Sequence, residues 1–136
     1  MADEQNRLSI IGEDECWELL GTVPVGRLAM DSPEGLLIIP VNFVVADEAV
    51  VFRTAEGGVL AGAATWGRDV AFQADRIEEA IKWGWSVLVQ GQMRRVADVE
   101  AERLLSAVSP WAGGERHVVG RISANKISGR RIGETT

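Results

Sequence analysis

The residues best suited to bind an anion lie in one segment, VVFRTAEGGVLAG, residues 50–62. Arg53 and Thr54 end a β-branched run, and a turn that contains Gly58 follows. A guanidinium and a hydroxyl at a strand end can donate hydrogen bonds to an anion, and a glycine turn can point backbone N–H groups into a concave nest. The same residues also suit an ordinary solvated strand end, so the spacing leaves both a phosphate site and a surface turn open.

The sequence contains none of the familiar catalytic constellations. It has one histidine, His117, and one cysteine, Cys16, which are too few for a zinc site of the usual composition. We expect His117 to be packed or on the surface and Cys16 to be buried on a helix. Neither a nucleophile-elbow motif nor a phosphate-binding loop motif is present. If the protein is an enzyme, its chemistry therefore belongs to a bound cofactor.

Composition indicates one globular domain over residues 1–136, with residues 1–10 as a flexible N-terminus and 133–136 as a short tail. The apolar fraction is 46%, the charged fraction 25% and the net charge −6, which disfavours a nucleic-acid surface. Of the 14 basic residues, 12 are arginine. An anionic ligand or a genome bias would both explain that ratio. No secretion signal or membrane-length apolar run is present, so we expect a cytoplasmic protein.

Hydrophobic periodicity predicts mainly β structure with a few short helices. Helices are expected at 12–21, 59–65 and 98–108, and strands at 23–31, 35–47, 48–55, 68–75, 83–98, 117–125 and 126–132. Asp98 is the expected N-cap of the last helix. Strand 83–98 alternates, with one apolar face made of Trp85, Val87, Val89, Gly91 and Met93. Short antiparallel connections without alternating β–α units favour a small antiparallel barrel.

Two further features have alternative interpretations. Trp83 and Trp85 flank Gly84, so both can project to one side of a strand, either into the core or an oligomer interface, or beside a flat ring. Arg27 interrupts an apolar strand and must either reach solvent or be paired.

The motifs taken together resemble a known family. Their order along the chain is GRLAM, IIPVNFVV, VVFRTAEGG, VAFQAD, GWSVLVQGQ, PWAGGER and ISGRRI. This order resembles that of the pyridoxamine 5′-phosphate oxidase-like proteins with the FMN-binding split-barrel fold, in particular the short actinobacterial-type members. The resemblance runs from about Leu19 to Ile132.

The resemblance implies a homodimer that binds FMN in two clefts at the subunit interface. The strand that contains Pro40, Val41, Asn42 and Phe43 would run along the isoalloxazine ring. The other implied cofactor contacts are Arg53 and Thr54 at the ribityl and phosphate, Gly58 in the phosphate turn, Trp85 and Ser86 near the ring, and Arg130 or Arg131 close by.

Two departures from the family pattern matter: the first argues against pyridoxamine phosphate as the substrate, and the second implies weaker binding of the FMN phosphate. The true oxidases carry basic residues where this chain has Ile38 and Phe43, and relatives commonly have a lysine where it has Val59. We therefore expect an FMN-dependent oxidoreductase that acts on another small molecule. The alternatives are a deazaflavin-dependent reductase and a non-catalytic split-barrel dimer that binds haem or another ligand, or serves as a sensor.

Overall fold

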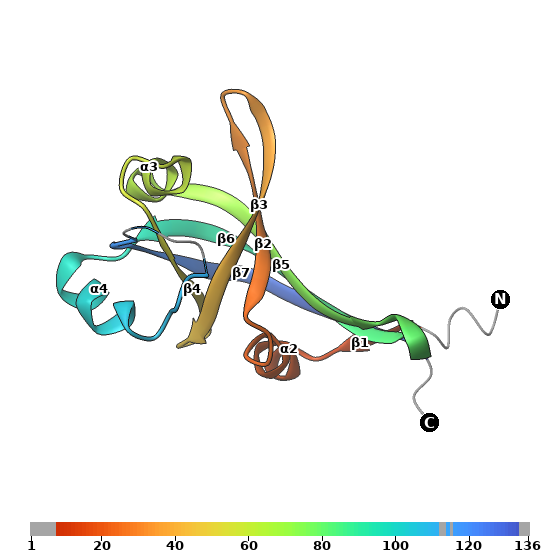
Figure 1. The fold of residues 1–136 in the computed structure, drawn as a ribbon. Helices are drawn as coiled ribbons and strands as arrows, with labels where there is room; N and C mark the ends of the chain where they lie inside the picture. Colours follow the sequence, from red (N-terminus) through yellow and green to blue (C-terminus); the bar gives the residue numbers. More distant parts are fainter. Residues whose placement is uncertain (1–7, 112–113, 115, 134–136) are drawn as a thin grey trace.

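The computed structural model describes residues 8–111, 114 and 116–133, and these form a split β-barrel with short helices (Figure 1). The elements, in chain order, are β1 (Leu8–Ile11), α2 (Glu13–Leu20), β2 (Val25–Ser32), β3 (Gly35–Ala46), β4 (Ala49–Thr54), α3 (Val59–Trp66), β5 (Arg68–Glu78), the 3₁₀ turn η1 (Glu79–Ile81), β6 (Trp83–Arg95), α4 (Asp98–Leu105) and β7 (Val118–Ile132). The expected mainly β, antiparallel fold is confirmed.

The barrel closes because β7 is paired along both of its edges. The strand order is β1-β7-β4-β3-β2-β5-β6, and β6 also pairs with β7. The first half of β7 pairs with β4 and the second half with β1, whereas β6 follows both halves. The sheet therefore closes on itself at one end and splits at the other.

The C-terminal β region differs from the prediction, because the two expected segments, 117–125 and 126–132, form the single strand β7. They are joined through a bulge. Gln90 of β6 pairs with Lys126 and Gly91 pairs with Ala124, which leaves Asn125 as the extra residue. A Cβ atom at Gly91 would lie 1.9 Å from the carbonyl oxygen of Ser123, so only glycine fits this close approach.

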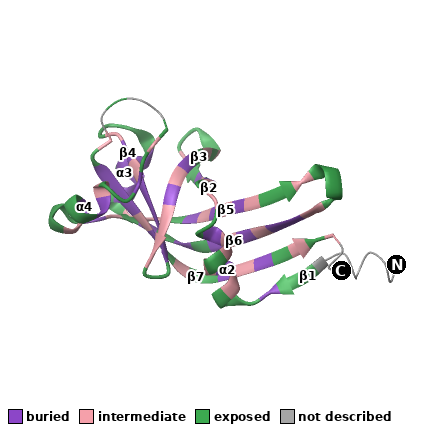
Figure 2. Ribbon diagram, turned by 60° about the horizontal axis from the view of Figure 1, so that its bottom comes forward, coloured by how far each residue is buried: buried purple, intermediate pink, exposed green. Residues whose placement is uncertain are grey.

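The barrel core forms from the inward-facing side chains of the strands. Figure 2 shows the buried positions along the ribbon in purple. The predicted alternation of β6 is confirmed, since its apolar face is buried. Helix α2 covers the split end, and its Cys16 and Leu20 are fully buried, as expected for Cys16. The Sγ atom of Cys16 lies 2.8 Å from where a Cβ at Gly129 would be, so glycine lets the helix approach β7 closely.

Helix α4 packs on the outside of the barrel. Its Ala101 and Leu104 join Val51 of β4 and Val119 of β7 in a second apolar cluster. The prediction that Asp98 is the N-cap is wrong. The extended residue before the helix is Ala97, so Asp98 is the first helical residue, and no side chain caps this end.

The chain start also differs from the prediction. Residues 8–10, expected to be flexible, form β1 with Ile11 and pair with the end of β7. The rest of the expected flexible start, residues 1–7, and the tail residues 134–136 lie outside the described residues. Within the described part of the chain, no helix has the length and apolar character needed to span a membrane.

Candidate functional site

One outward face of the barrel gathers polar side chains from four strands. Directly paired residues in a sheet project to the same side, so the strand register identifies this face. Arg130, Ser86 and Asp75 lie in one row across β7, β6 and β5. The neighbouring row on the same side includes Gln73 of β5, Arg27 of β2 and Pro40 of β3. We call Arg27, Gln73, Asp75, Ser86 and Arg130 the outer-face cluster.

Hydrogen bonds connect four of these residues. The Arg27 NH1 group donates to Oε1 of Gln73 at 3.3 Å and to Oδ1 of Asp75 at 3.4 Å. The Gln73 Nε2 group donates to Oδ2 of Asp75 at 3.0 Å and to Oγ of Ser86 at 3.1 Å. Arg27 is both paired and 47% exposed, so the two alternatives for it both hold. The network presents donors and acceptors to solvent in fixed positions.

The four predicted cofactor residues of β3 divide between the two sides of the sheet. Pro40 and Asn42 face outward, whereas Val41 and Phe43 are buried. The Phe43 ring meets the Phe72 ring edge to face, with 4.8 Å between their centroids. In this structure, Val41 and Phe43 therefore contribute core packing, and only Pro40 and Asn42 share the face of the outer-face cluster.

Asn42 also connects β3 to the segment that follows α4. Its Nδ2 donates to the Pro24 carbonyl at 3.3 Å, and its Oδ1 accepts the Trp111 backbone N–H at 2.8 Å.

Arg53 and Thr54 do not form the joint donor pair that the sequence predicted. They are consecutive strand residues, so their side chains leave opposite faces of β4. Thr54 is buried on the core side. The Arg53 guanidinium points under α4, where Nε donates to the Arg116 carbonyl at 2.9 Å and NH1 donates to those of Leu105 and Val108 at 3.0 Å each. Whether either residue also contacts a phosphate stays a prediction.

The glycine turn leads into α3, and Gly58 is the N-cap of that helix. No side chain caps this end, and Gly57 has a φ of +82° that favours glycine. Val59, at the position where the family resemblance implies a lysine, is half exposed as the first helical residue. Glu56 in the same turn forms a bidentate ion pair with Arg95, with distances of 2.9 and 3.1 Å.

Trp85 and Ser86 also separate onto opposite faces of β6. Ser86 belongs to the outer-face cluster, whereas Trp85 is 2% exposed and lies beneath α2. The same rule distinguishes Arg130 from Arg131. Arg130 is exposed on the side of Ser86, and Arg131 lies on the side of Trp85, where it pairs with Glu15 of α2.

The Glu15–Arg131 pair shifts the pKa of both groups. The hydrogen bond from Arg131 lowers the pKa of Glu15 below its ordinary value, and the same bond raises the pKa of Arg131. Burial raises the pKa of the Cys16 thiol, and the charges of Glu15 and Glu13 raise it further. Cys16 is therefore a packing residue and a poor nucleophile.

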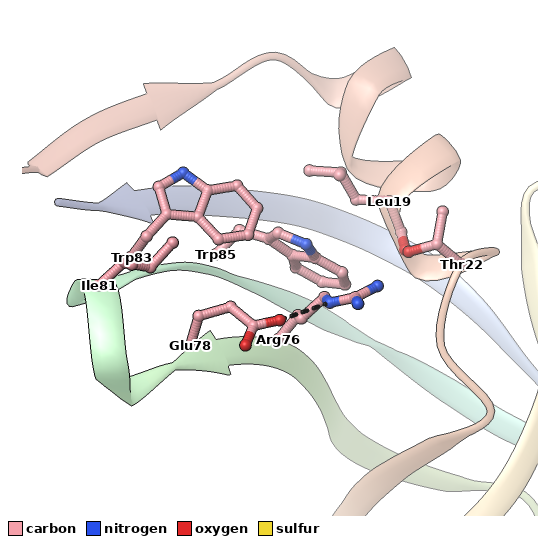
Figure 3. A pocket seen from close by; sticks show the side chains of 7 residues that line it. All are labelled: Leu19, Thr22, Arg76, Glu78, Ile81, Trp83 and Trp85. Carbon is pink, nitrogen blue, oxygen red and sulfur yellow. Dashed lines mark hydrogen bonds and ion pairs between the residues drawn. The ribbon is translucent and has the colours of Figure 1, made fainter. Parts of the chain in front are cut away.

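Beneath α2, a cleft of about 500 Å³ opens between the helix and the ends of β5 and β6 (Figure 3). It lies on the side of Trp85, across the sheet from the outer-face cluster. Among the described residues, no group of three or more histidine, cysteine, aspartate or glutamate side chains is placed to hold a metal ion.

Gln73 and Asp75 were not predicted as site residues from the sequence. The two residues are separated by one position in VAFQAD, a spacing that puts both polar side chains on the same face of a strand. That signal was available, but their contact with Arg27 depends on the pairing of β2 with β5.

Comparison with known proteins identifies relatives in both sequence and structure. A protein from Mycobacterium tuberculosis, Rv0080, is 31% identical over 127 residues, which cover 90% of this chain and 84% of the relative. The structure of an FAD-binding protein from Mycobacterium smegmatis superposes with a TM-score of 0.75 at 35% identity, covering 90% of this chain and 96% of the other. An FAD- and haem-binding protein from the same organism, at 14% identity and a TM-score of 0.74, covers 95% of this chain and 74% of its own and shares the fold.

The family model described as pyridoxamine 5′-phosphate oxidase matches residues 12–131, nearly the whole chain. The protein belongs to this family.

Proposed function

We propose that the protein is a flavin-binding oxidoreductase that holds its flavin against the outer-face cluster, beside Pro40 and Asn42. The observation that carries this proposal is the hydrogen-bonded network of Arg27, Gln73, Asp75 and Ser86 on one open face. The name of the FAD-binding relative, at 35% identity, supports a flavin.

The donor set of this face fits a flavin. An isoalloxazine ring presents several acceptors and one N–H donor, and the cluster supplies guanidinium, amide and hydroxyl donors together with the Asp75 carboxylate as acceptor. Arg130 and Lys126 are exposed on the same side and suit a phosphate. A bound flavin accepts hydride or electrons, so no side chain needs to act as a general base. The protein would contribute binding, orientation and electrostatics.

FMN is the flavin that we propose, because the family resemblance implies it. FAD is the second candidate, since the relative from Mycobacterium smegmatis is an FAD-binding protein. Both share the isoalloxazine ring and ribityl chain, but FMN ends in a phosphate monoester. Val59 in place of a lysine removes one cation that could hold that monoester, so the proposal expects modest FMN affinity.

The substrate is proposed to be a small molecule other than pyridoxamine phosphate. Ile38, at one of the two positions where the true oxidases are basic, is 73% exposed on the outer face. Phe43, at the other, is in the core. Neither can offer a charge to a substrate phosphate.

We also propose that a second copy of the chain covers this face. Exposed apolar side chains lie on both sides of the polar cluster, Leu36 and Ile38 beyond β2 and Ile10 and Ile77 toward the split end. An exposed apolar surface of this kind is typical of an association site. In such a dimer, the cations at the centre of the face would hold the flavin, and the flanking apolar side chains would contact the second subunit. The flavin would then lie between two subunits.

The test of flavin binding is the absorption spectrum of protein purified without added cofactor, followed by chromatography of the released chromophore. We expect a yellow protein that releases FMN. Released FAD would correct the identity of the flavin, and a deazaflavin or haem spectrum would support those alternatives instead. Colourless protein that binds neither FMN nor FAD in a titration would refute the proposal.

The location of the site is tested with Arg27→Gln and its matched control Arg103→Gln, which lies on α4 away from this face. Loss of one charged donor should weaken flavin binding about tenfold. The control should bind like the wild type. Equal affinities of all three proteins would place the flavin elsewhere.

Association is tested with Ile38→Asp against Val99→Asp, another strongly exposed apolar position, on α4. Analytical ultracentrifugation should show a dimer for the wild type and for the Val99 variant and a monomer for the Ile38 variant. A dimeric Ile38 variant, or a monomeric wild type, would contradict the proposed interface.

A further inference from the structure

A second candidate site lies on the opposite side of β5 and β6 from the outer-face cluster. The cleft beneath α2 has a volume of about 500 Å³ and is lined by Leu19, Thr22, Arg76, Glu78, Ile81, Trp83 and Trp85 (Figure 3). This volume lies within the range of about 300–1,000 Å³ that is usual for small-molecule sites. Arg76 pairs with Trp85 across the two strands, and Asp75 pairs with Ser86, so the sheet itself separates the cleft from the proposed flavin face.

The cleft has aromatic and aliphatic surfaces. Trp85 is buried and Trp83 is partly buried, and Figure 3 shows both indoles bordering the same space. Leu19 of α2 and the exposed Ile81 of η1 add apolar surface. Indole surfaces of this kind favour a flat ring, through stacked or edge-to-face contacts.

Polar groups are few. Among the described residues that line the cleft, Arg76 is the only cation. It forms a single ion pair with Glu78, Nε to Oε1 at 3.3 Å, and both side chains are about half exposed. A solvent-exposed ion pair of this geometry is weak, so a ligand carboxylate can replace Glu78 at the guanidinium. Thr22 already donates its hydroxyl to the Leu19 carbonyl at 2.6 Å, so it can offer a ligand only an acceptor.

We propose that this cleft binds a small planar aromatic carboxylate, with the ring against the accessible indole of Trp83, near the buried Trp85, and the carboxylate on Arg76. The site does not depend on the proposed flavin function, since it uses other residues on the other side of the sheet. A pocket with apolar walls and one cation at its edge selects for a flat anion over its neutral analogue.

The test is a titration of the protein with naphthoate, monitored by the indole N–H resonances in heteronuclear NMR spectra. The chain has five tryptophans, and those of the cleft can be assigned with Trp83→Phe and Trp85→Phe. We expect saturable shifts of the Trp83 and Trp85 signals, with those of the exposed Trp66 and Trp111 unchanged. No saturable shift, or equal shifts of all the signals, would overturn the proposal.

Charge recognition is tested with Arg76→Gln and with naphthalenemethanol as the neutral analogue. Losing the cation should weaken naphthoate about tenfold and change binding of the neutral analogue by less than about twofold. The matched control, Arg103→Gln, should bind both as the wild type does. An unchanged preference for the carboxylate in the Arg76 variant would contradict the assigned role of the guanidinium.

Two further measurements test whether a flavin or a second copy of the chain occupies the cleft instead. Added FMN or FAD should leave the naphthoate affinity unchanged, and competitive displacement would mean that the cleft belongs to the flavin site. The affinity should also be independent of protein concentration. Dissociation of a dimer by naphthoate would show that a second copy of the chain covers the cleft, and it would overturn the proposal.

Discussion

Removing the Arg53 guanidinium tests whether it supports the connection between α4 and β7 or holds a phosphate. Its Nε and NH1 groups donate to the carbonyls of Arg116, Leu105 and Val108 at 2.9, 3.0 and 3.0 Å. A hydrogen bond from a charged donor contributes about 1.5–3 kcal/mol. The three share one partly buried guanidinium and the carbonyls can regain water, so we expect a total loss of about 2–4 kcal/mol.

The variant Arg53→Met keeps much of the aliphatic stem and removes every donor. Its free energy of unfolding, measured by urea titration with circular dichroism, should fall by about 2–4 kcal/mol. Hydrogen exchange should quicken around Leu105, Val108 and Arg116, because their carbonyls lose the guanidinium that holds them. Arg53→Lys should recover only part of the loss, since an ammonium cannot reproduce the fork of a guanidinium.

The control is Arg103→Met, an exposed position of α4 whose loss should change stability by less than about 0.5 kcal/mol. The reasoning is refuted if Arg53→Met unfolds like the wild type. In that case a tenfold or greater loss of flavin affinity would instead support the phosphate role that the family resemblance implies. Loss of both stability and flavin affinity would mean that the guanidinium supports the fold and also binds the phosphate.

Three further predictions concern packing and titration. Gly91→Ala should destabilise the fold by about 3 kcal/mol in urea titrations, because its Cβ would overlap a carbonyl oxygen of β7; Gly62→Ala, with nothing within 4 Å, should not destabilise it. Arg131 lowers the folded pKa of Glu15, so this pair stabilises above the ordinary glutamate pKa and stops doing so as the pH falls through the lowered value. The stability difference between wild type and Glu15→Gln should therefore shrink as the pH falls below the ordinary glutamate pKa of about 4.3, and a difference that stays constant down to acidic pH would contradict it. Cys16, fully buried with a raised pKa, should react with iodoacetamide only after unfolding, and rapid alkylation of the native protein would disprove its burial.

Local pattern was sufficient for most of the secondary structure. Strand β6 alternates between buried and exposed residues as the sequence predicted, and the helices near residues 13–20 and 59–66 form where expected. Each depends on interactions between residues close together in the chain. The strand that the sequence did not predict lies where distant segments decide the outcome. The start of the chain becomes β1 only because β7 offers it an edge.

The candidate site could be predicted only in part. The family resemblance pointed to Ser86 and Arg130, which do share the outer face. It also paired Arg53 with Thr54 and Trp85 with Ser86 as neighbours, although strand geometry sends adjacent side chains to opposite sides. That alternation is a local rule, so the separation was foreseeable. The sequence did not show which side of each strand faces the core.

The sequence by itself determined the mainly β fold class, the course of most strands and family membership, because composition, periodicity and motif order are properties of the chain. Only the tertiary structure decided which side chains meet on the outer face of the barrel and which meet beneath α4. Arg27 and Asp75 stand 48 positions apart and meet because β2 pairs with β5 in one register. Arg53 reaches the carbonyl of Arg116, 63 positions away, because α4 packs over β4 and β7. Such contacts depend on strand register and helix packing, which are set by the burial of the whole core and not by any local segment.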